Sequence, residues 1–301
     1  EMRLYKLIGL EIEALMKDHD ETLKHIAEYE DILSNRATMA KVIIKELERY
    51  KKEYAMPRRT AIENAAEAVF EEKKIEEMDV VFLMDRFGYA KTIDVGAYER
   101  NKEAADTENR YILRCKNTDK ICIFTDRGQM HLLKVLDLPY GKFRDKGTPI
   151  DNLSNYNSSE ENLVYIAPMA DIRQKKLLFG TKTAMLKLVS GAEFDVAKRT
   201  TAATKLNEGD MVLFVHPVAE SDHIVMQSAK DMFLRIEAGT IPEKKKGAVG
   251  VRGMRLASGD QLEAIYLLRE EDEPVSVRIK DKEVVLNRLH VANRDTKGVK
   301  R

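Results

Sequence analysis

The sequence of 301 residues lacks several features that would assign a protein to a class at once. Its two cysteines, Cys115 and Cys122, do not form a C-x-x-C pair, which indicates a reducing compartment and two ordinary buried thiols. No apolar run approaches the roughly 18 residues of a membrane span, and the first residues do not resemble a signal peptide. We therefore expect a cytoplasmic protein without a membrane partner. Because the chain does not begin with Met, we also expect it to be a piece of a longer protein.

The chain has no excess of either charge. Lys and Arg number 51, Asp and Glu also number 51, and the formal net charge is zero. Net charge therefore says nothing about binding to nucleic acid or to a membrane surface, and the distribution of charge along the chain has to be read instead.

Motifs of catalysis and cofactor binding are missing as well. The sequence contains no G-x-S-x-G, no P-loop and no G-x-G-x-x-G. The six histidines are scattered without metal-ligand spacing: His19, His25, His131, His216, His223 and His290. We expect no metal site, no cofactor and no catalytic residue in this chain.

The first 56 residues show the period of amphipathic helices. Apolar residues recur at steps of three and four from Leu4 to Leu33, and again from Met39 to Tyr50. The turn formers of "SNRAT", residues 34–38, interrupt the pattern, and Pro57 ends it. Two helices with a short connection are expected to lie antiparallel. Residues 57–76 are predicted to be a linker.

From about Asp79 onward the period changes to two, and short β-branched and aromatic runs alternate with polar turns. Five hairpin-like units recur, each ending in Lys or Arg: residues 80–91, 121–134, 177–187, 223–235 and 275–288. A repeat of about 40 to 55 residues with some four short strands is typical of radially repeated β-structures. The sequence therefore predicts a mainly β, propeller-like domain over residues 77–301, with five blades, or six as the alternative.

The closing cations of the five hairpins recur at one point of the repeat: Lys91, Lys134, Lys187, Arg235 and Arg288. One interpretation is solvent-facing protection of strand edges. The other is a ring on the outer surface, where equivalent positions of successive blades form a positive stripe that follows the phosphates of duplex DNA without reading bases.

Further cations would extend such a stripe. They lie in three loops, and glycines interleave those of the third, which lets a backbone approach phosphate closely. A flexible solvated turn is the alternative for that loop. The candidate DNA-binding residues in these loops are Arg144, Lys146, Lys198, Arg199, Lys244, Lys245, Lys246, Arg252 and Arg255, and Lys142 is near them.

Taken together, these segments resemble a known family. "EMRLYKLIGLEIEAL", with its R-L-x-x-L-x-x-L-E pattern, and "VIIKELERYKKEYAMPRRTAI" look like the coiled-coil tail of the A subunit of bacterial type II topoisomerases, namely DNA gyrase and topoisomerase IV. The basic-ended hairpins, "KFRDKGTPIDNL" and "KGAVGVRGMRL" resemble the C-terminal β-pinwheel of the same polypeptide. The resemblance covers essentially the whole chain.

The resemblance implies a mechanism for the complete enzyme. The A subunit cleaves one DNA segment through a tyrosine ester, and a second duplex passes through the break, driven by ATP bound to a partner B subunit. The tyrosine domain would precede Glu1, so this fragment itself is not expected to cleave DNA, and ATP and Mg act elsewhere. The resemblance also implies an exit-gate contact with a second A subunit through Leu4, Leu7, Ile8 and Leu10, and strands that are swapped between neighbouring blades.

One departure from the family separates its two enzymes. Gyrase carries a Q-R-R-G-G-K-G box after its first hairpin, which wraps DNA chirally. The matching segment here, residues 98–111, contains no glycine and is acidic, with Glu99, Glu103, Asp106 and Glu108. The nearest box-like string is the degenerate "KKKGAVG" of residues 244–250. This departure favours a topoisomerase IV-like subunit that presents the transported DNA, and a gyrase subunit is the alternative. A protein-interaction propeller with no role on DNA is the rival of another class.

Overall fold

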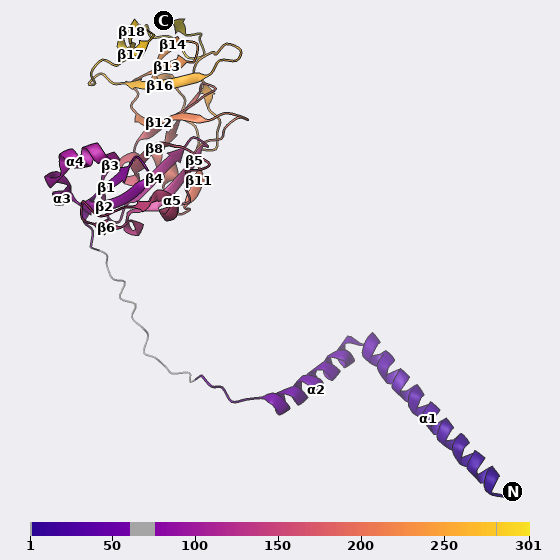
Figure 1. The fold of residues 1–301 in the computed structure, drawn as a ribbon. Helices are drawn as coiled ribbons and strands as arrows, with labels where there is room; N and C mark the ends of the chain where they lie inside the picture. The colour runs from indigo at the N-terminus through magenta and orange to yellow at the C-terminus, as the bar shows by residue number, and fades with distance from the viewer. Residues whose placement is uncertain (1, 61–75, 281) are drawn as a thin grey trace. The chain divides into compact units, whose positions relative to one another are not determined.

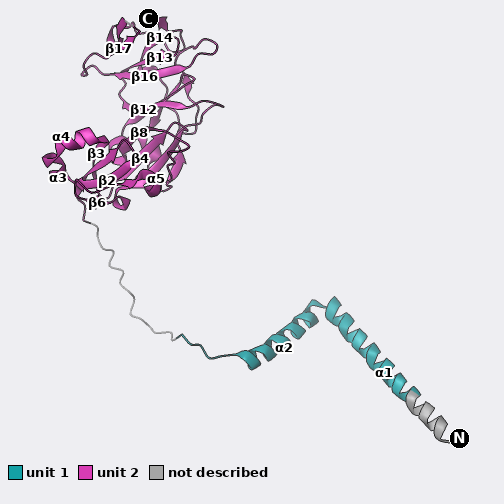
Figure 2. Cartoon of the chain, viewed as in Figure 1, with its two compact units in different colours: residues 1–72 teal, residues 73–301 magenta. Residues whose placement is uncertain are grey.

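The computed structural model describes residues 2–60, 76–280 and 282–301, with side chains from residue 12 onward. It divides the chain into two compact units, Glu1–Glu72 and Lys73–Arg301 (Figure 2). The predicted exit-gate residues Leu4, Leu7, Ile8 and Leu10 have side chains outside the described part, so this contact stays a prediction.

The first unit contains the two predicted helices, α1 (Met2–Ser34) and α2 (Arg36–Tyr54). The predicted break at residues 34–38 is a single residue in the structure, Asn35. Its side-chain oxygen accepts a hydrogen bond from the Ala37 amide and so caps α2. The helices diverge from this residue in Figure 1 and do not lie side by side as expected. Apolar residues along both helices are exposed, among them Leu15, Leu33 and Leu47.

The second unit is built from short strands and short helices (Figure 1). Its strands are β1 (Asp79–Asp85), β2 (Tyr89–Asp94), β3 (Asn109–Lys116), β4 (Lys120–Thr125), β5 (Gln129–Lys134), β6 (Tyr140–Gly141), β7 (Thr148–Pro149), β8 (Leu163–Pro168), β9 (Lys176–Thr181), β10 (Met185–Ser190), β11 (Thr200–Ala202), β12 (Val212–Val218), β13 (His223–Ser228), β14 (Met232–Glu237), β15 (Val251–Arg252), β16 (Leu262–Leu268), β17 (Ser276–Ile279), β18 (Lys282–Val285) and β19 (Val299–Lys300). Its helices are α3 (Val95–Arg100), α4 (Lys102–Glu108), α5 (Ile150–Leu153), α6 (Met169–Ile172) and the 3₁₀ turns η1 (Val135–Asp137), η2 (Gly191–Phe194), η3 (Ala238–Thr240) and η4 (Leu286–Arg288).

These strands form four larger sheets and one hairpin. The first sheet has the order β3-β1-β2-β6, with β7 also on β2; the second is β11-β5-β4-β8, the third β12-β9-β10-β15, and the fourth β16-β13-β14-β19. Strands β17 and β18 form the hairpin of a fifth unit. The mainly β, repeated architecture predicted from the sequence is confirmed.

The last strand of each large sheet comes from a later part of the chain. It is formed by residues that follow the hairpin of the next sheet. Strands β6 and β7 complete the first sheet although the β4–β5 hairpin lies before them in sequence, and β11 completes the second sheet after the β9–β10 hairpin. Strands β15 and β19 repeat this exchange in the third and fourth sheets. Strand exchange between neighbouring units was implied by the resemblance, and it is present throughout.

Both faces of the central strands are buried because each large sheet is covered on both sides, by a neighbouring sheet or by short helices. In β4, Ile121 and Ile123 face a core shared with the first sheet, whereas Cys122 and Phe124 face a core shared with the third. The exposed-and-buried alternation expected from the sequence is therefore replaced by continuous apolar runs, as in other strands covered on both sides. Helices α3 and α4 cover the outer face of the first sheet, and β17–β18 covers that of the fourth.

The two cysteines behave as predicted. Cys122 is buried and Cys115 half-buried, and both are free thiols. Burial raises the pKa of Cys115 to about 12, so its thiol stays protonated and unreactive at neutral pH.

A glycine in the third sheet provides a test of the exchanged segment. Gly250 has φ of +104°, and a β-carbon there would lie 2.7 Å from the Leu186 carbonyl oxygen. Gly247, three residues earlier, has open space around it. We expect Gly250→Ala to lower the free energy of unfolding by about 1–3 kcal/mol and Gly247→Ala to change it little, measured by urea denaturation. Equal effects of the two substitutions would contradict this account of the segment.

Candidate nucleic-acid interface

The exchanged segments place one loop at the same edge of each large sheet. In the first sheet, β6 runs parallel to Thr92 and Ile93 of β2, the chain leaves the sheet at residues 142–147, and β7 returns antiparallel to Tyr89 and Ala90. Equivalent loops lie at 196–199 on the second sheet, 244–250 on the third and 292–298 on the fourth. We call these four segments the edge loops.

The opposite edges of the sheets face one another. Strand β3 contacts β8, β8 contacts β12, and β12 contacts β16, so these strands form a chain of contacts from the first sheet to the fourth. The edge loops lie on the far side of each sheet from this chain of contacts. Equivalent positions of successive units therefore do lie in a row, as the repeat predicted, although the row consists of loops.

Most of the predicted DNA-binding residues are exposed and available to a ligand. Those on edge loops are Arg144, Lys146, Lys198, Arg199 and Lys245, while Arg252 and Arg255 follow the third edge loop, and Lys134 and Arg288 are exposed at the ends of their hairpins. Two of these cations are partly neutralised, because Arg252 and Arg255 each place a guanidinium nitrogen 3.6 Å from Asp295 Oδ1. Lys244 and Lys246 are half-buried, and the Lys246 ammonium donates to the Glu193 carbonyl at 2.8 Å.

The prediction that all closing cations lie at the surface is wrong for Lys187. Its side chain is 1% exposed, and its ammonium donates to the carbonyl oxygens of Lys246 at 2.7 Å and Ala248 at 2.9 Å. It also lies over the Phe179 ring, 5.4 Å from the centroid. Burial lowers the pKa of Lys187 to about 8, and the nearby Glu193 carboxylate opposes this shift.

Lys91 and Arg235 are half-buried and also bind carbonyl groups. The Lys91 ammonium donates to Phe143 and, at 2.8 Å, to Asp145 in the first edge loop. Burial lowers its pKa, while Glu108, Asp145 and Asp85 oppose the shift. The Arg235 guanidinium donates to the carbonyl of Asn287, in η4, at 2.6 Å. These two cations therefore hold the chain that follows the next hairpin, which is a structural role that the sequence did not indicate.

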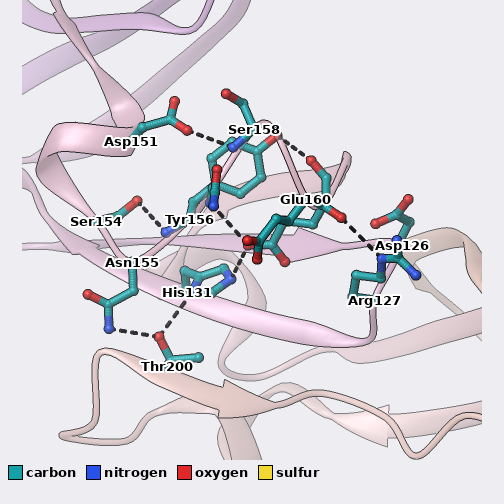
Figure 3. Close-up of polar contacts among 12 residues, drawn as sticks. Asp126, Arg127, His131, Asp151, Ser154, Asn155, Tyr156, Ser158, Glu160 and Thr200 are labelled. Atoms are coloured by element: carbon teal, nitrogen blue, oxygen red, sulfur yellow. Dashed lines mark hydrogen bonds and ion pairs between the residues drawn. The ribbon is translucent and has the colours of Figure 1, made fainter.

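In the second sheet a histidine occupies the place of these lysines (Figure 3). His131 pairs with Ile123 across the hairpin, as Lys91 pairs with Leu83 and Lys187 with Phe179. The ring is buried, with Nδ1 3.0 Å from Thr200 Oγ1 and Nε2 2.8 Å from Glu161 Oε1. Tyr156 packs edge-on against it. The cluster is polar, and His131 and Glu161 line an open pocket of about 720 Å³. The part of the chain that the structure describes contains no group of three or more His, Cys, Asp or Glu side chains able to hold a metal ion.

The acidic segment after the first hairpin, residues 98–111, lies mostly in α3 and α4 rather than in an open loop. Two of its carboxylates are engaged locally: Glu99 pairs with Arg114, and Asp106 accepts a hydrogen bond from the Tyr98 hydroxyl at 2.9 Å. An open cavity of about 750 Å³ separates α4 from the first edge loop, with Glu108 on one side and Arg144 and Lys146 on the other. The Glu108 carboxylate therefore lies close to the basic side chains of the first edge loop.

Sequence reasoning missed the fourth edge loop. Its segment "NRDTKGVK" carries Arg294, Lys297 and Lys300. The similarity to "FRDKGT" in the first edge loop was the available signal. The glycines of the two segments confirm the match, since β-carbons at Gly147 and Gly298 would meet the backbone of Ala90 and Phe233, equivalent residues of β2 and β14.

Comparisons with known proteins agree with this geometry. A family model described as the DNA gyrase C-terminal domain, a β-propeller, matches residues 175–219 and 222–269, which span the third sheet and most of the fourth. The resemblance to type II topoisomerase A subunits is confirmed. The DNA gyrase A subunit of Lawsonia intracellularis is 29% identical, over 99% of this chain and 38% of the relative, and that of Chlamydia muridarum is 27% identical, over 92% and 35%. The chain thus spans little more than a third of the length of these relatives.

Solved structures show the same fold for the second unit. A crystal structure of the C-terminal domain of DNA topoisomerase IV gives a TM-score of 0.67 at 22% identity, covering 75% of this chain and 73% of that one. The Escherichia coli ParC C-terminal domain gives 0.61 at 14% identity, covering 74% and 94%. The fold is the β-pinwheel. No helix in the described residues is long and apolar enough to cross a bilayer.

The buried lysine has a consequence for stability against pH. The native pKa of Lys187 is about 8, below its ordinary value of 10.5, so the native state binds fewer protons than the unfolded state between these values. Stability contributed at this site is therefore lowest below pH 8 and rises toward pH 10.5. We expect the free energy of unfolding of the native chain, minus that of Lys187→Met, to increase by about 1–2 kcal/mol from pH 7 to pH 9.5. Lysines shared by both proteins cancel in the difference. A flat difference would show that Lys187 keeps its ordinary pKa.

Proposed function

We propose that this chain is part of the A subunit of a bacterial type II topoisomerase and that its pinwheel, residues 77–301, binds and bends duplex DNA. The observation that carries the proposal is the row of edge loops, which brings exposed Lys and Arg side chains from successive sheets to one side of a chain with zero net charge. Such a row can follow a phosphate backbone without contacting base edges. The names of the relatives support the same function.

The pinwheel is proposed to present the flanking DNA as the transported segment. Strand passage would be driven by ATP on a B subunit, in a heterotetramer with a second A subunit, in the bacterial cytoplasm. No cofactor is proposed for this chain, and ATP and Mg would act elsewhere in the enzyme. We also propose that α1 and α2 belong to the coiled-coil tail of the subunit. Their exposed apolar side chains support this, because such side chains need a partner to cover them.

Between the two enzymes, helices α3 and α4 beside the first sheet favour topoisomerase IV. Gyrase-like wrapping needs a basic segment after the first hairpin, whereas α3 and α4 carry Glu99, Glu103, Asp106 and Glu108. Glu108 lies across a cavity from Arg144 and lowers the positive potential there. Gyrase is the alternative, for which the segment at 244–250 is the candidate box. A protein-interaction propeller would not need cations on every edge loop.

The DNA-binding proposal is tested by the salt dependence of affinity for random duplex DNA. We expect log Kd to change steeply with log salt, and Arg144→Gln, Arg199→Gln and Lys245→Gln each to reduce the slope by about one, since each removes about one phosphate contact. Lys175→Gln is the matched control, because Lys175 is exposed but lies outside the edge loops. Weak, salt-independent binding would favour the protein-interaction propeller instead.

The choice of enzyme is tested on the full-length protein in complex with its B subunit. Because the acidic helices α3 and α4 follow the first hairpin, we expect relaxation and decatenation but few or no negative supercoils. Replacing residues 101–108 with a basic, glycine-rich segment should increase chiral wrapping, measured as a linking-number change after relaxation of the bound plasmid. Efficient supercoiling by the native enzyme would instead assign the chain to gyrase.

A further inference from the structure

We propose that Lys91 and Lys187 are positioning residues, which hold the backbones of the first and third edge loops from beneath so that the cations of those loops face a phosphate backbone. The inference deepens the proposed function and rests on it for the identity of the ligand. The positioning itself rests on contacts within this chain.

Each lysine binds carbonyl oxygens from the loop that covers it. Lys91 reaches Phe143 and Asp145, which flank Arg144. Lys187 reaches Lys246 and Ala248, which flank Gly247. Lys187 also lies 3.4 Å from the Lys245 carbonyl oxygen. In both loops, carbonyl groups on either side of one residue turn inward to one ammonium, which fixes the backbone at that point. The third edge loop is also fixed by Glu193, whose carboxylate accepts a hydrogen bond from the Lys246 amide at 3.0 Å.

A glycine gives each loop a second point of attachment. Gly147 and Gly250 are the last residues of the two loops, and a β-carbon at either would lie 2.7 Å from the carbonyl oxygen of Ala90 or Leu186. These are the strand residues immediately before Lys91 and Lys187. The lysine and the close glycine contact therefore fix adjacent points of the same strand to the two ends of the loop.

The other two sheets show that the lysine accompanies the most basic loops, whereas the close glycine contact recurs at Gly298 of the fourth sheet. The first and third edge loops each carry three cations, which repel one another: Lys142, Arg144 and Lys146, and Lys244, Lys245 and Lys246. The equivalent strand position is His131 in the second sheet, whose ring contacts the Thr200 hydroxyl, and Leu234 in the fourth, which pairs with Met226. Their loops carry two cations each in residues 196–199 and 292–298. Lysine thus occupies the position where a loop needs most help to hold one shape.

Geometry excludes Lys187 from direct contact with DNA. The side chain is 1% exposed and its ammonium is occupied by carbonyl oxygens. It can therefore act on a phosphate through the shape of the loop above it. Holding the loop in shape releases no counterion from DNA, so this route does not contribute to the salt slope.

The test compares Lys187→Met and Lys91→Met in the complete chain. Lys91 is half-buried, so its variant remains informative if the Lys187 variant does not fold. The first readout is hydrogen exchange without DNA. We expect Lys187→Met to raise exchange at the bonded amides of Lys246 and Ala248 by roughly tenfold or more, while amides of the β9–β10 hairpin are unchanged. Leu234→Met, at the equivalent position of the fourth sheet, is the control and should leave the edge loops unchanged.

The second readout is affinity for random duplex DNA over a range of salt. If the lysines preorganise the loops, we expect each lysine variant to weaken binding by roughly three- to tenfold and to leave the salt slope unchanged. Lys245→Gln, in contrast, should reduce the slope by about one. A slope reduced by about one would make the lysine a phosphate contact and overturn the proposal, as would unchanged exchange in the loops. If the native chain does not bind DNA, the proposed function fails, and the exchange experiment still decides whether the lysines position the loops.

Discussion

Each of the four larger sheets is completed by a short strand that the chain supplies only after it has formed the next hairpin. Strands β6 and β7 lie on the first sheet, yet they come after the β4–β5 hairpin of the second. A unit therefore cannot complete its own sheet, and neighbouring units are tied by backbone hydrogen bonds as well as by side-chain packing. The edge loops follow from this constraint, because the chain must leave one sheet edge to reach the next unit. The position of the cations is thus a property of the connectivity.

Charge is sorted by location, although its sum is zero. Four carboxylates are buried in turns and polar clusters, where they accept hydrogen bonds: Asp126, Glu161, Asp210 and Asp222. Others lie on α3 and α4. The cations of the edge loops, in contrast, mostly face water. The composition alone could not reveal this separation of charge, because it depends on which carboxylates the folded chain uses as hydrogen-bond acceptors in its turns.

The sequence was sufficient for the parts of the structure that rest on pattern. Hairpins, turns and the two helices follow from apolar periodicity and from Asn35 and Pro57, and the family followed from short motifs. Strand exchange could not be predicted from the residues, because β6, β7, β15 and β19 are two residues long and carry no pattern of their own. It came only from the resemblance.

The closing cations show a second limit, which is register. Lys134 and Lys187 both follow a short apolar run, and they look equivalent in the sequence. Counted from the hairpin turn, however, Lys187 matches His131, whereas Lys134 lies three residues farther along β5. One side chain is buried beneath a loop and the other is exposed. Whether a cation of the repeat is buried or exposed can therefore be decided only when the cross-strand pairing is known.

The central claim is that one duplex lies along the row of edge loops. The most direct test places a photo-cross-linking amino acid at residue 144, 199 or 245, on three successive edge loops, and at 110 or 263, on strands β3 and β16 of the opposite edge. The account predicts cross-links to labelled duplex DNA from all three edge-loop positions and from neither opposite-edge position. Cross-links from residues 110 and 263, or from only a single edge loop, would contradict it.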